Sequence, residues 1–296
     1  MPGTLCLLLK QGERYHVFMF QIDFCFKEGW ITDMINLIHS ELYKLRKSRS
    51  FRVAGGLAVL FTMIVYLMYE LLRNNMVEGL DAAAAEAVFE VDILQILREM
   101  FANSNTIIFV TVFVCLFVLG DHTGGAIKNF VGKGFRREEI YLARFLVTEF
   151  GAVMIYLLTA LAVLSGGLVF FGTEQINGTM LHDFASYLSL HILYLTGYTA
   201  IIIMVCEMTR NMTGILISIL GVLLLSNVLL EGIDIVIRAL GMPFAISKYW
   251  ILTVIRSCPV TDIPARFVTG SGIITGVWLI AALAAGMLYF SRKDVK

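Results

Sequence analysis

The residue types that usually carry enzymatic chemistry are present in this chain, but not at the spacings that such chemistry requires. The motifs HExxH and GxSxG are both absent. The histidines that follow residue 33 show no paired spacing typical of a metal site: His39, His122, His182 and His191. The one candidate phosphate loop, Gly132-Lys133-Gly134, lacks the spacing, the Ser or Thr and the preceding strand of GxxxxGK[ST]. We therefore expect no metal site, no cofactor and no ATP binding by that route.

A second near-match concerns two adjacent carboxylates. Glu138 and Glu139, followed by Arg144, are similar to the EExxxR signature of glutamic-type intramembrane proteases. Here four residues, not three, separate the second glutamate from the arginine, and the group falls on a predicted helix outside the membrane. An intramembrane enzyme is therefore the least favoured hypothesis.

A few polar residues interrupt the apolar runs, where ionisable groups are costly and often functional. Glu149 lies about one turn into an apolar run, and Glu207 closes the next one. Arg210 follows Glu207 at a spacing that predicts a local ion pair. His191 and Asn227 are the candidates for lining a polar translocation path, and the alternative for each is a hydrogen bond between helices.

The composition requires a membrane setting for these residues. The mean hydropathy is +0.80, with 58% hydrophobic and 16% charged residues, far more apolar than a soluble domain of this length needs to be. We expect an all-α polytopic membrane protein with six transmembrane helices, at about 53–72, 103–120, 145–171, 184–206, 213–231 and 270–290. The formal net charge is zero, so bulk charge predicts no nucleic-acid partner.

The distribution of basic residues predicts the orientation of these spans. The regions that would lie inside hold most of the lysines and arginines: Lys44, Arg46, Lys47, Arg49, Arg52, Lys128, Lys133, Arg136, Arg137, Arg144, Arg210, Arg292, Lys293 and Lys296. The regions that would lie outside hold fewer: Arg73, Arg98, Arg238, Lys248, Arg256 and Arg266. This bias favours six spans with both termini in the cytoplasm.

The longest inside segment, Gly120 to Arg144, is a polar, basic stretch between two apolar runs. It ends in a predicted helix over 136–144. A loop of this size can dock a soluble partner. The alternative is that Arg136, Arg137 and Arg144 only set the topology and have no partner.

The start of the chain divides into an extension, residues 1–33, and the membrane domain, residues 34–296. The extension lacks the apolar core and cleavage site of a signal peptide. It is either a short cytoplasmic segment or the result of a misassigned start, because Lys27-Glu28-Gly29 can be encoded by a purine-rich ribosome-binding sequence shortly before Met34. Residues 34–51 predict an amphipathic helix on the inner membrane surface.

The segment from Gly232 to Thr269 is neither a polar loop nor a full span. It is apolar in the middle, carries Tyr249 and Trp250, and is divided into short pieces by prolines. Short re-entrant helices before the last span account for this pattern if protein covers their irregular backbone. An amphipathic external hairpin is the alternative.

Three of these stretches together resemble the permease family of ABC-2 type ABC transporters, over residues 34–296. HSELYKLRKSRSF at 39–51 resembles the amphipathic opening of that family. Gly125, Ile127-Lys128-Asn129, Arg137 and EEIYLAR at 138–144 are similar to its first cytoplasmic loop, although Ala126 stands where threonine is usual. The proline-broken segment resembles its external re-entrant helices.

The resemblance implies a transmembrane subunit of an ATP-driven exporter, not itself an enzyme. Its loop would dock on a separate ABC ATPase subunit through Lys128, Asn129, Arg136, Arg137 and Glu139. A second copy or a paralogue would complete the substrate route in the lipid bilayer of a cell membrane, bacterial inner or cytoplasmic. The scarcity of charge favours an amphipathic peptide, antibiotic or lipid-like substrate. The alternative, favoured less because the spans show no broken helix beyond Gly166-Gly167, is a secondary transporter or channel acting without an ATPase.

Overall fold

The computed structural model describes residues 34–77, 92–103, 105–123, 130, 132–173, 176–209, 211 and 217–292, and every regular element within these ranges is a helix. A helix over 34–47 comes first. The elements that follow are α2 (Arg49–Val77), α4 (Ile93–Phe101), α5 (Asn105–Thr123), α7 (Arg137–Phe171), α8 (Gly178–Thr209), the π-helix η1 (Ile217–Leu225), α10 (Ser226–Ala239), the 3-10 helix η2 (Ser247–Tyr249), α11 (Ile251–Ser257) and α12 (Ala265–Arg292). The predicted extension, residues 1–33, lies outside the described residues.

Six helical stretches in the described chain are long and apolar enough to cross a membrane: Arg49–Leu72, Ile93–Asp121, Arg137–Phe171, Gly178–Thr209, Ile217–Ala239 and Ala265–Ser291. Each contains or overlaps one predicted span, so the prediction of an all-α, six-span membrane protein is confirmed. The helices run further than the apolar stretches because a helix continues into the interface after its sequence has become polar.

The second stretch is broken near its beginning, which the sequence did not predict. The predicted span begins at residue 103, whereas α4 already buries Ile93 and Phe101 in the bundle. Side chains of α5 satisfy carbonyl groups that the break leaves without helical partners. Asn105 Nδ2 donates to the carbonyl of Glu99 at 2.9 Å, and Thr106 Oγ1 donates to the carbonyl of Met100 at 2.9 Å.

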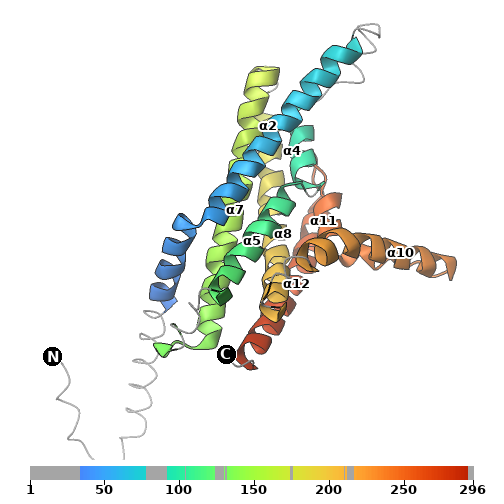
Figure 1. The fold of residues 1–296 in the computed structure, drawn as a ribbon. Helices are drawn as coiled ribbons and strands as arrows, with labels where there is room; N and C mark the ends of the chain where they lie inside the picture. Colours follow the sequence, from blue (N-terminus) through green and yellow to red (C-terminus); the bar gives the residue numbers. More distant parts are fainter. Residues whose placement is uncertain are drawn as a thin grey trace, which may run out of the picture.

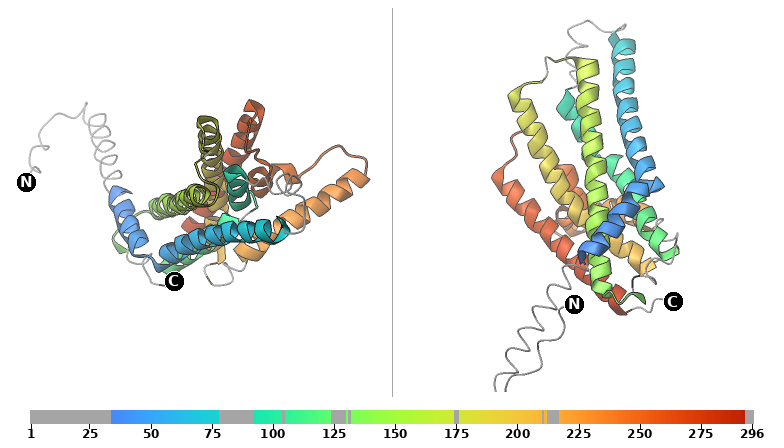
Figure 2. Two further views of the ribbon diagram at one scale, coloured as in Figure 1. Left: turned by 90° about the horizontal axis from the view of Figure 1, so that it is seen from above. Right: turned by 90° about the vertical axis from the view of Figure 1, so that its left-hand side faces the viewer.

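Helix α8 is the centre of the bundle, in contact with α4, α5, α7, α11 and α12, while α2 packs along α7 and α5 (Figures 1 and 2). The pair Gly166-Gly167 does not break α7, which is continuous from Arg137 to Phe171. Both glycines instead allow close packing. A Cβ on Gly166 would lie 2.3 Å from the ring of Tyr66, and one on Gly167 would lie 2.6 Å from Ile93.

Three parts of the chain meet at one end of the bundle, the lower end in Figure 1: the helix over 34–47, the start of α7 and the last turn of α12. We call this the loop end. The helix over 34–47 lies within the stretch 34–51 for which an amphipathic surface helix is predicted, and its buried positions are Leu37, Glu41 and Leu45, spaced four residues apart. Its position on the membrane surface stays a prediction. The first and last described segments thus lie at the same end, as an even number of spans requires.

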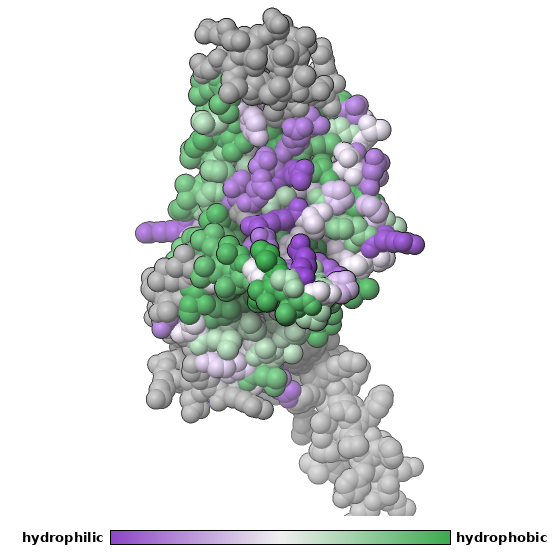
Figure 3. All heavy atoms as spheres, turned by 90° about the vertical axis from the view of Figure 1, so that its right-hand side faces the viewer, coloured by the Kyte–Doolittle hydropathy of each residue, from purple (hydrophilic) through white to green (hydrophobic). Residues whose placement is uncertain are grey.

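Helix α10 leaves the bundle and points away from it (Figure 1), and its exposed side chains include Val228, Leu229 and Val236. Figure 3 views this side of the molecule, where apolar residues cover much of the surface and hydrophilic ones gather mainly in the upper half. Apolar side chains exposed in this way are those expected to face lipid.

The chain after α10 returns to the bundle as short helices. The carboxylate of Asp234 accepts hydrogen bonds from the backbone N–H groups of Ile246 (2.6 Å) and Ser247 (3.1 Å), which fixes the start of η2. Helix α11 then packs against α8 and α12 and buries Ile251 and Ile255. Covering by protein is the condition set above for a re-entrant segment, and the depth of α11 in the membrane stays a prediction.

Candidate functional site

The start of α7 at the loop end is fixed by its own residues. Arg136 is the N-terminal cap position, and its backbone N–H donates to Oε2 of Glu139 at 3.2 Å. Glu138 and Glu139 both lie in the first turn, where carboxylates interact favourably with the positive end of the helix dipole. Glu139 is consequently buried, whereas Arg136 and Glu138 are exposed.

The same turn of α7 holds the end of α12. The guanidinium of Arg137 donates to the carbonyl of Ser291 at 3.1 Å, and this carbonyl belongs to the last turn of α12, where no further residue of the helix can pair with it. Tyr141 lies with its ring centroid 6.1 Å from that of Phe290. A Cβ on Gly286 would lie 2.1 Å from the hydroxyl oxygen of Tyr141, so a glycine is required there.

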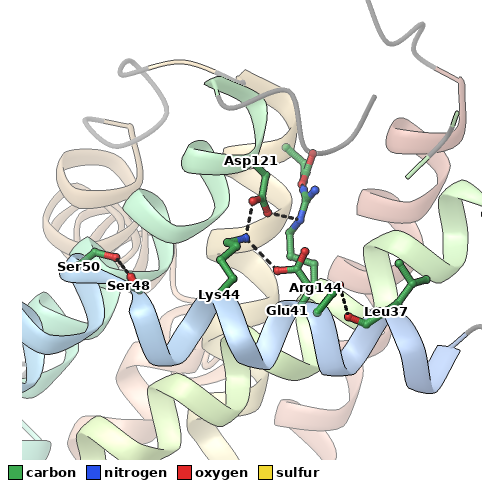
Figure 4. A network of polar contacts seen from close by, with 9 residues as sticks. Leu37, Glu41, Lys44, Ser48, Ser50, Asp121 and Arg144 are labelled. Carbon is green, nitrogen blue, oxygen red and sulfur yellow. Dashed lines mark hydrogen bonds and ion pairs between the residues drawn. The ribbon is translucent and has the colours of Figure 1, made fainter. Parts of the chain in front are cut away.

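Two turns further along α7, five charged residues form what we call the ion cluster: Glu41, Lys44, Asp121, Arg144 and Glu207. Figure 4 shows Glu41, Lys44, Asp121 and Arg144. Arg144 Nη1 donates to Glu207, and Arg144 Nε lies 3.0 Å from Oδ2 of Asp121, close enough for an ion pair but without hydrogen-bond geometry. Lys44 Nζ donates to Oε2 of Glu41 at 2.9 Å and also to Asp121. Asp121 thus bridges the two cations.

The ion cluster is held almost entirely inside the protein. The exposed fractions are 1% for Arg144, 0% for Glu207, 2% for Asp121 and 3% for Glu41. Charges at this depth persist only when each has an oppositely charged or hydrogen-bonding partner, because desolvation costs several kcal/mol per ion. The members come from four elements: the helix over 34–47, α5, α7 and α8.

The far half of the bundle, which we define as α7 from Tyr156 onward and α8 as far as Tyr194, contains neutral polar groups instead. His191 is 1% exposed and lies among aromatic rings, with centroid distances of 4.0 Å to Tyr187, 5.8 Å to Tyr194 and 6.0 Å to Phe101. Its Nδ1 is 3.0 Å from the carbonyl of Tyr187, which can only accept, so Nδ1 carries the proton. Because no carboxylate is among these contacts and a buried charge needs a partner, we expect the buried, aromatic-lined imidazole of His191 to be neutral.

Comparison with known families gives this arrangement a context. Residues 37–225, well over half of the chain, match the family described as ABC-2 family transporter protein. The chain belongs to this ABC-2 transporter family. A search among curated proteins found no match. The ABC-2 permease is accordingly a multi-pass membrane protein and a transport subunit, and the resemblance seen in the sequence is confirmed.

The predicted docking residues differ in their exposure to solvent. Lys128 and Asn129 lie outside the described residues. Arg136 is exposed at the loop end, whereas Arg137 is half-buried against α12 and Glu139 is buried in the cap of α7. The charged residues that a partner can reach at this turn are therefore Arg136, Glu138 and, just before them, Lys133.

The two predicted path residues are not brought together. Asn227 lies on α10 and is 4% exposed, and its Nδ2 is 3.5 Å from the carbonyl of Leu223 in the preceding π-helix η1. Within the described part of the chain, no hydrogen bond or ring contact joins it to His191 on α8. Both contacts are local, to the carbonyl four residues earlier, and neither is the hydrogen bond between helices that was the alternative role, so lining a translocation path stays a prediction for both residues.

The ion cluster was missed at the sequence level. Glu207 was paired with Arg210, three residues on, but its partner in the structure is Arg144, 63 residues away, and Arg210 lies outside the described residues. One signal was available: Glu41 falls between Leu37 and Leu45 on the buried stripe of an amphipathic helix, where an unpaired charge is not tolerated.

Proposed function

We propose that this permease is the membrane subunit of an ATP-driven exporter and that the segment between α5 and α7 docks on a separate ABC ATPase subunit. Two copies, or one copy and a paralogue, form the substrate route in the cell membrane of a bacterium. The chain hydrolyses nothing itself, and the partner supplies the energy.

The continuity of α7 is the observation that carries this proposal. Its 35 residues correspond to about 52 Å of helix, against about 30 Å of hydrocarbon core. The docking turn at Arg136–Glu139 and the third span are therefore one rigid rod. A displacement of the first turn by a partner that closes on ATP reaches the far half of the bundle without any intervening joint.

The docking contact is electrostatic on this proposal. Lys133 and Arg136 are exposed at the loop end, so they can pair with acidic residues in a groove of the ATPase. Lys128 and Asn129 precede them in the same segment and belong to the proposed contact. Arg137 and Glu139 support it from inside, by fixing α12 and the cap of α7.

The proposed substrate is an amphipathic peptide, an antibiotic or a lipid-like molecule. The aromatic rings around His191 and the amide of Asn227 offer weakly polar surfaces suited to such molecules when the helices that cover them separate. Alternating exposure of these surfaces, driven from the loop end, would move the substrate across the membrane.

The test is co-purification with the ATPase encoded by a neighbouring reading frame. Replacing Lys133→Glu and Arg136→Glu together should remove most of the ATPase that co-purifies with the tagged permease, while the permease still inserts. The matched control is Arg46→Glu with Lys47→Glu, which makes the same change in charge at exposed positions of the same end of the molecule.

Two results would contradict the proposal. If both double variants lose the ATPase equally, the attraction is general and not a docking at this turn. If the unmodified permease retains no ATPase and moves solute down an ion gradient in vesicles on its own, it is a secondary transporter or channel.

A further inference from the structure

The ion cluster holds both stems of the proposed docking segment. Asp121 lies in the last turn of α5, just before the segment, and Arg144 lies two turns into α7, just after it. The two side chains are in contact, with Arg144 Nε 3.0 Å from Asp121 Oδ2. A displacement of the segment therefore acts on this contact directly.

The same contact is joined to two further elements. Arg144 donates to Glu207 in the last turn of α8, and Asp121 accepts from Lys44 on the helix over 34–47. Lys44 also lies 3.9 Å above the ring centroid of Phe117 on α5. Four elements thus meet at one point about 12 Å along α7 from its capped end at Arg136, eight residues before Arg144.

Stability alone does not require these charges. Replacing a complete buried ion network by apolar side chains of similar volume is often neutral or stabilising, because the attraction between the ions is largely offset by the free energy needed to remove them from water. What charged contacts add is direction. Arg144 pairs with carboxylates on α5 and α8, and Lys44 pairs with one on α5, so the helices joined in this way shift together between defined arrangements.

We infer that the ion cluster transmits the movement of the docking segment to α8 and to the helix over 34–47, with Arg144 and Asp121 as positioning residues. This inference rests on the proposed function. Arg144 passes the displacement of α7 to α8 through Glu207. Asp121 passes it to the helix over 34–47 through Lys44, the one partly exposed member of the cluster, at 32% of its side chain.

The first variant neutralises the core of the cluster as a unit: Arg144→Met, Asp121→Leu and Glu207→Leu. It is compared with the unmodified permease in complex with its ATPase, by hydrogen–deuterium exchange with and without ATP and vanadate. In the unmodified complex, nucleotide should change exchange in the docking segment, in the helix over 34–47 and at the end of α8. In the variant, the ATPase should still co-purify and hydrolyse ATP, but nucleotide should change hydrogen–deuterium exchange in the docking segment alone.

The control removes a different polar contact between the same two helices. Thr199 on α8 donates to Glu149 on α7, outside the ion cluster. Glu149→Leu with Thr199→Val should leave all three nucleotide-dependent changes in place, because this change keeps the contacts of Arg144 with Asp121 and Glu207 and that of Lys44 with Asp121.

A second variant keeps the test decisive if the first does not fold. Glu41→Leu with Lys44→Met removes only the branch to the helix over 34–47. It should abolish the nucleotide response of that helix and leave the response of α8 intact, a separation that general destabilisation would not produce.

The outcomes separate the two proposals. If no ATPase co-purifies with the unmodified permease, the proposed function fails and this inference with it. If the complex forms and the cluster variants respond to nucleotide as the unmodified protein does, docking stands and the transmitting role of the ion cluster is wrong.

Discussion

The two ends of the α7–α8 pair differ in the kind of polar group that is buried between the helices. At the loop end the helices are joined by ionised groups, and Arg144 donates to Glu207 while both are almost fully buried. In the far half the same interface contains neutral hydroxyl and imidazole groups. The hydroxyls of Tyr156 and Tyr187 are buried there without a hydrogen-bond partner among the described residues.

The difference follows from what each group costs when its partner is lost. A buried ion that loses its partner destabilises the protein strongly, so the loop end must keep its ion pairs together. A neutral hydroxyl without a partner costs only about 1–3 kcal/mol, so the far half can rearrange its contacts. If a partner drives the permease from the loop end, as we propose, the loop end must keep its arrangement and the far half must be able to change its own.

The largest effect that this comparison predicts is the loss of one ion alone. Arg144→Met should destabilise the permease by about 3–5 kcal/mol, because Asp121 and Glu207 then lose a buried cation. The measurement is denaturant unfolding in detergent. The triple variant that also replaces both carboxylates should recover most of this loss, and a single variant as stable as the unmodified protein would contradict the assignment.

The sequence predicted the six spans well but not this cluster, for a physical reason. Apolar runs long enough to cross a membrane are a local signal, so each span could be placed before any packing was known. The pairing of Arg144 with Glu207 joins residues that are 63 positions apart, and local spacing instead favoured Arg210. Arg144 also looked like part of a polar loop, because its burial depends on α5 and α8 closing over it.

The docking segment shows the same limit. Its basic character and its helix after residue 136 were visible in the sequence. The sequence does not indicate that α7 is one helix through both the segment and the span, because the change from polar to apolar sequence at residue 145 predicts a boundary there. The inward role of Arg137 depends on the end of α12, more than 150 residues later, and no local pattern indicates it.

An intermediate effect is predicted for the far half, where the packing of α7 depends on shape. Gly166→Ala should destabilise the permease by about 1–3 kcal/mol, because its Cβ would lie 2.3 Å from the ring of Tyr66. Gly276→Ala on α12 is the matched control, since nothing lies within 4 Å of a Cβ there. The control should be neutral or stabilise the helix by up to about 1 kcal/mol. Equal losses of unfolding free energy in the two variants would show that the contact with Tyr66 yields without cost.

The smallest predicted effect on stability is the difference between removing a tyrosine hydroxyl that has a hydrogen-bond partner and removing one that has none. Tyr198 and Tyr156 are both fully buried, but the hydroxyl of Tyr198 lies 2.6 Å from Thr111 Oγ1, whereas that of Tyr156 has no partner among the described residues. Tyr198→Phe should cost about 0.6–1.7 kcal/mol, the range for hydrogen bonds between membrane helices. Tyr156→Phe should leave the free energy of unfolding unchanged or increase it, since it removes a polar atom that has no hydrogen-bond partner in this structure.

If Tyr156→Phe lowers the free energy of unfolding as much as Tyr198→Phe does, the hydroxyl of Tyr156 is paired in the membrane and the contacts of the far half are as fixed as those of the loop end. If Tyr198→Phe destabilises the permease and Tyr156→Phe does not, the contacts of the far half can rearrange more freely than those of the loop end. A loss of transport in Tyr156→Phe without a loss of stability would show that this hydroxyl has a hydrogen-bond partner in another state of the transporter.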